Sequence, residues 1–368
     1  QERRGPMPSL KELLPEIEKV AQVKGSFVGD LVQVARIPTG IFELDLAIGG
    51  GMPRGGLTEI FGPEGSGKTN LALATIRGAQ GQDKKTKQAF IDVEGTWDPK
   101  WSARMGVDVS RVYVIRPLFA EQVSDAMQKL VTADDLNCIV LDSIAAMCPE
   151  KEAEEDSTKQ FYGGASKTIK RMTQKAMVEF NRRRNEDLPA PAVIWINQTR
   201  ANFDAGPYGN PEKTPGGKSP MFAYILRLRT YSKPIVDPAV SKSLPTIRQT
   251  SVAVKKSKIP ITAENVKFDL VMLPHKDLKT GEVDSWHTVE RVLKAAGTLV
   301  KLPKDKGWKL IDVEFPTLKA ARIKFREDAE FRAALQEGII GAAVSAEGYV
   351  IEDEPFDPET GELSPGVA

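Results

Sequence analysis

The 368-residue chain has few residues of the kinds that build disulfide frameworks or metal clusters. Its cysteines are Cys138 and Cys148, and its histidines are His275 and His287. Two cysteines are too few for a disulfide framework, and these four residues lack the spacing of a zinc cluster. The shortage excludes a small disulfide-stapled domain and favours a reducing compartment.

Long apolar runs and a strong net charge are also missing. No run approaches the roughly 20 apolar residues that cross a bilayer, and the amino-terminal stretch lacks the apolar segment of a signal peptide. We therefore expect a cytoplasmic protein that has no membrane contact. The net charge is +1, so any binding of nucleic acid must depend on local patches rather than on the whole surface.

Short β-branched, apolar runs alternate with longer helical stretches in the middle of the chain, from about residue 40 to 271. This alternation predicts an α/β fold with a mostly parallel central sheet, which we place in a core of residues 40–274. The strand candidates are 57–61, 88–93, 111–115, 138–142, 192–197, 224–231 and 250–256.

An amino-terminal segment, residues 1–39, is predicted to hold one helix and a linker. The helix starts near Pro15 and ends at Gly25. Its apolar face has to dock either on its own core or on a neighbouring subunit, and the sequence favours neither. We expect the segment to serve oligomerisation.

The carboxyl-terminal part is predicted to hold a small α/β domain, residues 275–342, and then an acidic flexible tail, residues 343–368. In the small domain, helices at 287–297 and 326–339 flank a strand at 308–315. The end of the chain is rich in Asp and Glu and has no Lys or Arg, which is typical of a solvated tail.

The stretch GPEGSGKT, residues 62–69, lies between a strand and a helix and matches the phosphate-loop pattern G-x-x-x-x-G-K-[ST]. Glycines let successive backbone N–H groups face one phosphate, and the following helix adds its positive end. Lys68 is expected to reach the β- and γ-phosphates, and the Thr69 hydroxyl to bind Mg²⁺. The residues predicted to bind a nucleoside triphosphate here are Gly62, Pro63, Glu64, Gly65, Ser66, Gly67, Lys68, Thr69 and Asn70.

Carboxylates at the ends of two other predicted strands complete the expected chemistry. Asp142 ends one apolar strand and is the second predicted Mg²⁺ ligand beside Thr69. Glu94 follows another strand, at the edge where open α/β sheets collect ligands, and is expected to orient or deprotonate the attacking water. Asp92, two residues earlier, is the alternative base.

These motifs and their order resemble the RecA-type recombinases. The resemblance rests on the stretches IPTGIFELDLAIGGGMPRGGLTEIFGPEGSGKT, AFIDVEGTWDP, IVLDSIAAMCPE, WINQTR, YGNPEKTPGGK and VAVKKSKI, and it extends from about residue 10 to about 340. It implies a DNA-dependent ATPase that uses ATP and Mg²⁺ and assembles into a helical filament on single-stranded DNA. Such a filament pairs the strand with a homologous duplex and exchanges strands. The chain diverges from the well-known bacterial members, as a phage-encoded or otherwise distant relative would.

The resemblance also assigns roles around the nucleotide. Glu94 falls on the catalytic glutamate, and Gln198 falls on the glutamine that senses the γ-phosphate. Lys256 and Lys258 fall on lysines that reach the ATP of the neighbouring subunit, where a cation in trans stabilises the transferring phosphoryl group.

The base of the nucleotide is expected near the stretch WDPKW. Asp98 and Trp101 fall where relatives hold the adenine, and an aromatic ring suits stacking on a purine. From the residues alone, Trp101 also fits an ordinary core or surface tryptophan.

Two DNA-binding loops are implied as well. The second spans about residues 199–220, and its predicted DNA contacts are Arg200, Asn202, Phe203, Tyr208, Gly216, Gly217 and Lys218. The first begins with acidic residues and ends in a basic stretch, where Lys167, Lys170, Arg171 and Lys175 are predicted to contact DNA. Without the resemblance, that basic stretch also fits a solvated helix face. Asn202 and Met221 stand where bacterial relatives usually carry lysine, which changes the loop contacts.

Two other functions share the phosphate loop. A ring-forming helicase has the same core ancestry, although the Lys256/Lys258 pair and the amino-terminal helix favour a filament. An ATP-gated DNA coat that exchanges no strands is the second alternative, and Glu94 favours real hydrolysis over it.

Overall fold

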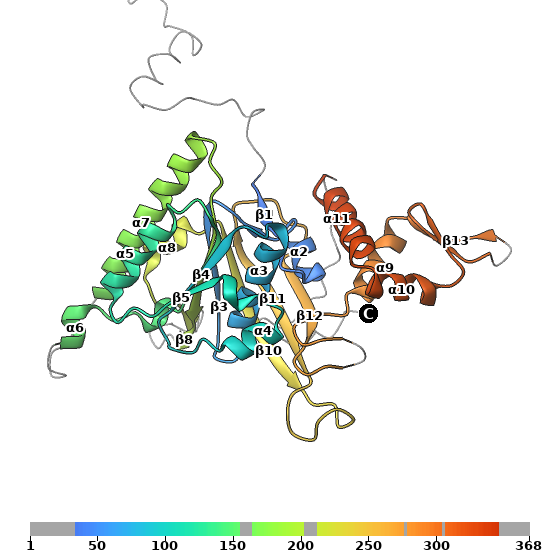
Figure 1. Ribbon diagram of the computed structural model, residues 1–368, viewed down its shortest axis with the longest axis horizontal. Helices are drawn as coiled ribbons and strands as arrows, with labels where there is room; N and C mark the ends of the chain where they lie inside the picture. The colour runs from blue at the N-terminus through green and yellow to red at the C-terminus, as the bar shows by residue number, and fades with distance from the viewer. Residues whose placement is uncertain (1–33, 155–163, 202–211, 276–277, 304–305, 346–368) are drawn as a thin grey trace, which may run out of the picture.

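The computed structural model describes residues 34–154, 164–201, 212–275, 278–303 and 306–345 (Figure 1). The predicted amino-terminal helix and nearly all of the predicted acidic tail lie outside these residues. The helices of the larger part are α2 (Phe42–Ala47), α3 (Lys68–Gln82), α4 (Pro99–Arg104), α5 (Ala120–Leu130), α6 (Glu150–Glu154), α7 (Gly164–Asn185) and α8 (Lys218–Ala223), with 3-10 turns at Val109–Arg111 and Ile144–Ala146. Among the described residues, no helix combines the length and the apolarity that a bilayer span needs.

An eight-stranded sheet forms the centre, in the order β12-β11-β10-β3-β7-β6-β4-β5. The pairs from β10 through β5 are parallel, whereas β10, β11 and β12 pair antiparallel at the other edge. The mostly parallel α/β sheet predicted from the sequence is therefore present. Its strands are β3 (Gly56–Gly62), β4 (Lys87–Asp92), β5 (Val112–Ile115), β6 (Leu136–Asp142), β7 (Ala192–Gln198), β10 (Leu226–Ile235), β11 (Ile247–Ser257) and β12 (Asn265–Val271).

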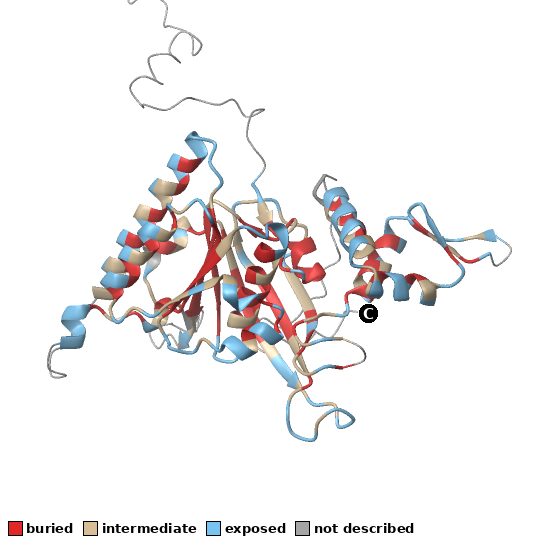
Figure 2. Cartoon of the chain, in the orientation of Figure 1, coloured by how far each residue is buried: buried red, intermediate tan, exposed pale blue. Residues whose placement is uncertain are grey.

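Different helices cover the two faces of the sheet, so the strands are buried between them (Figures 1 and 2). Successive side chains of a strand point to opposite faces. Val140 therefore joins the cluster that packs under α3, whereas its neighbours Ile139 and Leu141 join the cluster under α5 and α7. Burial on both faces explains why the parallel strands are continuous apolar runs in the sequence.

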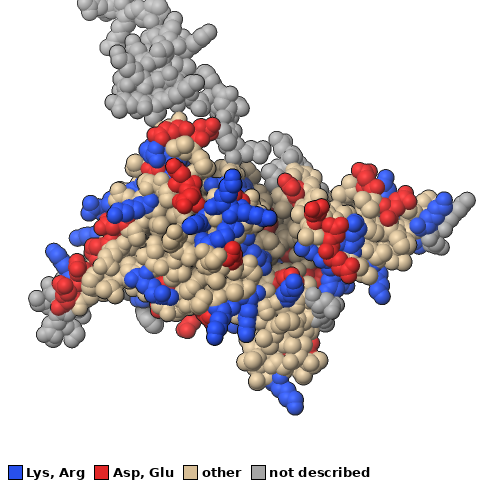
Figure 3. Space-filling view, in the orientation of Figure 1, with Lys and Arg blue, Asp and Glu red and all other residues tan. Residues whose placement is uncertain are grey.

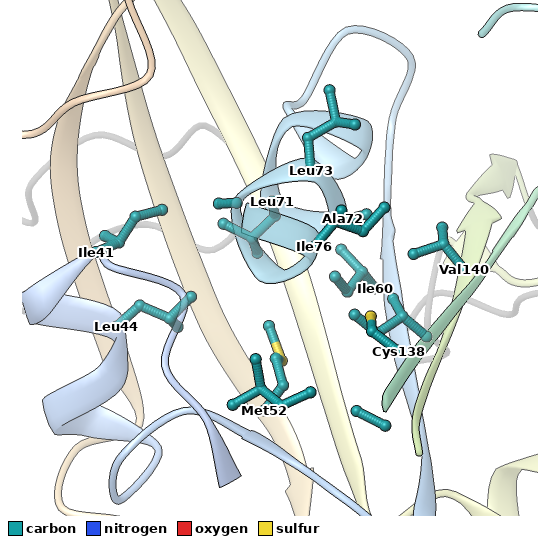
Figure 4. Packing of buried hydrophobic residues seen from close by; sticks show 14 of the residues in the cluster. Ile41, Leu44, Met52, Ile60, Leu71, Ala72, Leu73, Ile76, Cys138 and Val140 are labelled. Carbon is teal, nitrogen blue, oxygen red and sulfur yellow. The ribbon is translucent and has the colours of Figure 1, made fainter. Parts of the chain in front are cut away.

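Helix α3 packs its apolar side chains directly on the centre of the sheet. In Figure 4, Ile76 of this helix lies by Ile60, with Cys138 and Val140 on the same side, whereas Leu71 lies on the side from which Leu44 of α2 approaches. A short ribbon of β1 (Arg36–Ile37) and β2 (Met52–Pro53) closes this side. The helix that begins at the phosphate loop is thus fixed at its core, which gives the loop a rigid base.

The sequence missed β12, which lies within the predicted core. The strand alternates apolar residues with Lys267 and Asp269, because it is the antiparallel edge of the sheet and its ladder partner is β11. The pair of short strands β8 (Arg200–Ala201) and β9 (Glu212–Lys213) was also not predicted.

The carboxyl-terminal part forms a unit to one side of the sheet (Figure 1). A third apolar cluster joins its helices and strands, and Phe42 and Leu46 of α2 take part in it, so the unit packs against the core through α2. Its elements are α9 (Trp286–Ala295), β13 (Leu299–Lys301), β14 (Trp308–Leu310), β15 (Val313–Phe315), α10 (Leu318–Glu327) and α11 (Ala329–Ser345).

Two predictions for this unit need correction. The segment 308–315 is a hairpin of β14 and β15, and not one strand, because Ile311 at the turn adopts a positive φ of 50°. The predicted helix at 326–339 is the end of α10 followed by α11; Asp328 separates them and its backbone is extended. Helix α11 ends at Ser345.

Two glycines of α3 should respond oppositely to replacement by alanine. A Cβ on Gly78 would lie 1.7 Å from the Pro38 carbonyl oxygen, whereas a Cβ on Gly81 would meet nothing within 4 Å. We expect Gly78→Ala to lower the free energy of unfolding by about 3 kcal/mol through overpacking. Gly81→Ala should raise it by about 0.5–1 kcal/mol through helix propensity. Urea unfolding of both variants checks this; equal midpoints would contradict the close approach of α3 to Pro38.

Candidate functional site

The phosphate loop connects the end of β3 to the start of α3. Gly67 immediately precedes α3 and has a φ of 89°, which favours glycine. Gly62 has no room for a side chain, since a Cβ there would lie 2.4 Å from the Thr230 carbonyl oxygen. The Ser66 and Thr230 hydroxyls lie 2.8 Å apart and join the loop to β10. The loop conformation is therefore set by both its glycines and its neighbours.

Lys68 is buried at the base of this loop. Its ammonium donates to the carbonyl oxygens of Gly62, at 3.1 Å, and of Pro63, at 2.7 Å. Burial lowers the pKa of Lys68, and the nearby Asp142 and Glu94 carboxylates oppose that shift. The cation therefore lies between the loop and the two predicted carboxylates.

Thr69 and Asp142 meet where the phosphate loop faces the end of β6. The Thr69 hydroxyl donates to Asp142 Oδ2 at 2.9 Å. Asp142 is only 2% exposed, and burial raises its pKa to about 6, with the Thr69 hydrogen bond acting in the opposite direction. A hydroxyl and a carboxylate side by side are hard oxygen donors of the kind that Mg²⁺ takes. The donor set therefore fits Mg²⁺ held together with phosphate.

Glu94 receives hydrogen bonds from two other strand ends. Its Oε1 accepts from the Ser143 hydroxyl at 2.5 Å and from Gln198 Nε2 at 3.0 Å. Glu94 is exposed to solvent. The ends of β4, β6 and β7 thus bring together a carboxylate, a hydroxyl and an amide beside the phosphate loop, at one edge of the parallel sheet.

Asp92, the alternative base, is buried, and its oxygens accept hydrogen bonds from the turn after β4 and from one arginine. Oδ1 accepts from the Thr96 backbone N–H at 2.9 Å; Oδ2 accepts from the Trp97 N–H at 3.2 Å and from Arg116 Nε at 3.1 Å. These bonds shape the turn after β4. Asp92 therefore holds the segment that presents Glu94.

A pocket of about 270 Å³ extends from the phosphate loop toward Trp101. The Trp101 indole N–H donates to Asn70 Oδ1 at 3.0 Å, which sets the ring against the start of α3. Asp98 caps α4 by accepting from the backbone N–H groups of Lys100 and Trp101. Its carboxylate thus positions the helix that carries Trp101. Two further residues, Arg248 and Met272, line the pocket; no sequence motif marks them.

Lys256 and Lys258 lie far from the phosphate loop of their own chain. In the register of the sheet, Lys256 of β11 lies opposite Arg227 of β10, and Arg227 lies opposite Glu59 of β3. The loop begins at Gly62, about 10 Å further along the strands, and β10 separates β11 from β3. The two ammonium groups instead donate to the last carbonyl groups of α8: Lys256 to Met221 and Phe222, and Lys258 to Phe222 at 2.6 Å.

The second predicted DNA loop is anchored at both ends. Arg200 is exposed at its start, in β8, which pairs with β9. Near its end, Asn197 Nδ2 donates to the Pro215 carbonyl at 3.0 Å, and Gly216 and Gly217 have positive φ values of 104° and 77°. The predicted contacts Asn202, Phe203 and Tyr208, and the side chain of Lys218, lie outside the described residues.

The basic stretch of the first predicted loop forms the start of α7. Lys167, Lys170 and Arg171 are exposed there. Lys175 donates to Gln128 Oε1 at 2.5 Å and lies 4.0 Å from an Asp125 oxygen, both on α5. Its contact with DNA stays a prediction. On the face shown in Figure 3, cationic and acidic side chains are both present, and neither kind covers the whole face.

Burial of the Asp142 carboxylate should lower the free energy of unfolding of the nucleotide-free protein at neutral pH. Its folded pKa of about 6 exceeds the ordinary value of 3.8, so its charged form is disfavoured in the folded state. The cost is full above pH 6 and disappears as the pH falls below 3.8. We expect Asp142→Asn to raise the free energy of unfolding at pH 8 by on the order of 2–3 kcal/mol. At pH 3.5 the difference should vanish; a constant difference across this range would contradict the assignment.

Comparisons with known proteins agree with this geometry. Residues 9–274 match the family model of the RecA N-terminal domain, which is more than half of the chain. The Protein RecA of Aquifex pyrophilus is 34% identical over 243 residues, covering 66% of each chain. The Protein RecA of Thermus aquaticus is 39% identical over 225 residues, covering 60% of this chain and 63% of the relative. These two alignments span just under two thirds of the relatives' length. The Protein RecA of Mesorhizobium japonicum is 34% identical over 284 residues, covering 75% of this chain and 73% of the relative.

Proposed function

The chain belongs to the RecA family, and on that premise we propose that it is a DNA-dependent ATPase. In this proposal it assembles with ATP into helical filaments on single-stranded DNA and carries out homologous pairing and strand exchange with a duplex. The observation that carries the proposal is the hydrogen bond from Gln198 to Glu94. It joins the expected hydrolytic carboxylate to the strand end from which the second DNA loop departs.

The nucleotide would be held by the phosphate loop, with Lys68 at the β- and γ-phosphates and Trp101 at the base. Thr69 and Asp142 would hold Mg²⁺, which when bound neutralises charge on the phosphate oxygens. Glu94 would orient the attacking water and take its proton. The Ser143 hydroxyl and the Gln198 amide both donate to the same oxygen of Glu94, so they fix the direction of its carboxylate.

DNA binding would be linked to this site through Gln198. The Gln198 amide can donate to a phosphate and accept from a backbone N–H. A change of its hydrogen-bond partner would therefore affect the loop that follows Gln198. The neighbouring Asn197 holds the other end of that loop at Pro215. DNA contacts would come from this second loop and from Lys167, Lys170 and Arg171 of the first, since these three lysine and arginine side chains are exposed.

Assembly would complete the active site in trans. Lys256 and Lys258 would reach the phosphates of the neighbouring subunit and leave the α8 carbonyl groups that they now contact. Hydrolysis would then depend on the filament. The amino-terminal segment, residues 1–39, would mediate the subunit contact, with 40–274 as the ATPase core, 275–342 as the small domain and 343–368 as the tail. We place this activity in the cytoplasm, with the DNA.

The proposal is tested by measuring ATP hydrolysis with and without single-stranded DNA, together with strand exchange between a circular single strand and a linear duplex. We expect DNA to stimulate hydrolysis, and joint molecules to form with homologous but not with heterologous duplex. DNA-stimulated hydrolysis without joint molecules would indicate a motor or a coat instead.

A further inference from the structure

Arg248 reaches the phosphate loop from the antiparallel edge of the sheet. It is the second residue of β11, on the side that also carries Thr250 and Val252. Val252 belongs to the cluster under α3, and Thr250 Oγ1 is 3.8 Å from the position of a Cβ on Gly67. These three side chains of β11 therefore form a row that leads from the core to the phosphate loop. Arg248 is its outermost member and lines the pocket that Trp101 closes at the other side.

The guanidinium of Arg248 has only neutral partners among the described residues. Its Nη1 donates to the Gly65 carbonyl and, at 2.9 Å, to the Ser232 hydroxyl. Its Nε–H is buried without a hydrogen-bond partner, and no described carboxylate forms an ion pair with it. A half-buried cation without a counter-charge is costly unless an anion arrives.

We infer that Arg248 binds the diphosphate portion shared by ADP and ATP, as a second cation from the same subunit beside Lys68. Thr69, Asp142 and Glu94 surround the place expected for the γ-phosphate, and Trp101 lies at the place expected for the base. Arg248 lines the pocket between these two places, so it faces the expected middle of the nucleotide. A guanidinium offers a planar fork of N–H donors that matches phosphate oxygens. This inference rests on the proposed binding of ATP at the loop.

The test is the affinity of the full-length protein for ADP and adenosine, measured by calorimetry. We expect Arg248→Gln to weaken ADP binding about 10- to 100-fold and to leave adenosine binding unchanged. Ser232→Ala is the matched control, because Ser232 also donates to the Gly65 carbonyl, at 3.2 Å, but carries no charge. It should bind ADP within about twofold of the parent protein.

Two results would overturn the inference. In one, Arg248→Gln binds ADP as the parent protein does; in the other, Ser232→Ala loses as much affinity as Arg248→Gln, so that support of the loop and not charge is what matters. If the parent protein itself bound no ADP, the proposed function would fail, and this inference with it.

A measurement on the unaltered protein covers the case in which Arg248→Gln fails to fold. Phenylglyoxal modifies accessible arginines, and mass spectrometry locates the modified residues. ADP, but not adenosine, should protect Arg248, while exposed Arg171 on α7 should react equally in all samples. Equal modification of Arg248 with ADP and with adenosine would contradict the contact.

Discussion

Replacement of Glu94 by glutamine is expected to lower ATP turnover by about two to four orders of magnitude, the range for losing a general base. Nucleotide affinity should change little, because Lys68, Thr69 and Asp142 remain in place. The amide keeps an oxygen that can accept from Ser143 and Gln198, whose hydrogen bonds now meet at Glu94 Oε1. It cannot accept the proton of the attacking water. Single-turnover hydrolysis and ADP titration of the same preparation measure the two quantities separately.

Asp92→Asn is the matched control, since this carboxylate is the last residue of β4 and lies two residues before Glu94. Its oxygens accept from two backbone N–H groups and from Arg116, so an amide would lose part of that network. We expect a lower unfolding temperature and a smaller effect on the chemical step. Turnover at the parental rate in Glu94→Gln, together with its loss in a stably folded Asp92→Asn, would transfer the role of base to Asp92.

Loss of both Lys256 and Lys258 is expected to reduce DNA-stimulated hydrolysis at least about 100-fold, as cations supplied in trans do elsewhere. Each chain should still bind ATP, because Lys256 lies about 10 Å from its own phosphate loop along the strands and Lys258 follows it on the side away from the loop. Lys255→Ala is the control: Lys255 is exposed and points to the other side of β11. Steady-state hydrolysis with saturating single-stranded DNA measures the effect.

Mixing experiments separate a role in trans from a structural one. Lys68→Ala lacks its own nucleotide site but keeps Lys256 and Lys258, whereas the double variant has the reverse defect. Mixed assemblies contain interfaces at which both halves are intact, so the mixture should hydrolyse ATP although neither variant does so alone. An inactive mixture would mean that the lysines serve only to hold the end of α8, where they contact Phe222.

The parts of this site that could be predicted from sequence are the ones that follow parallel strands. Gly62, Glu94, Asp142 and Gln198 each stand at or just after an apolar run, and parallel strands bring such positions to one edge. The alternation of apolar runs and helices likewise predicted the sheet. Asp98 had a readable signal too, because an Asp before Pro99 is typical of a helix cap. Local pattern and topology agree at these positions.

Features that depend on long-range pairing could not be predicted in this way. Arg248 comes to the loop through an antiparallel hairpin, and its contact with Gly65 spans 183 positions with no motif at either end. Lys175 turns to α5 because of how two helices pack, which a charge pattern does not reveal. The turn at Ile311 lacks the Gly or Asn that usually marks a positive φ, so the hairpin resembled one strand.

The central claim is that nucleotide, DNA and subunit contact act together in a filament. Electron microscopy of the protein with single-stranded DNA and a slowly hydrolysed ATP analogue tests it most directly. The account predicts continuous helical filaments along the DNA, which are lost without nucleotide. Discrete closed rings under the same conditions would contradict it and would assign the phosphate loop to a translocating helicase.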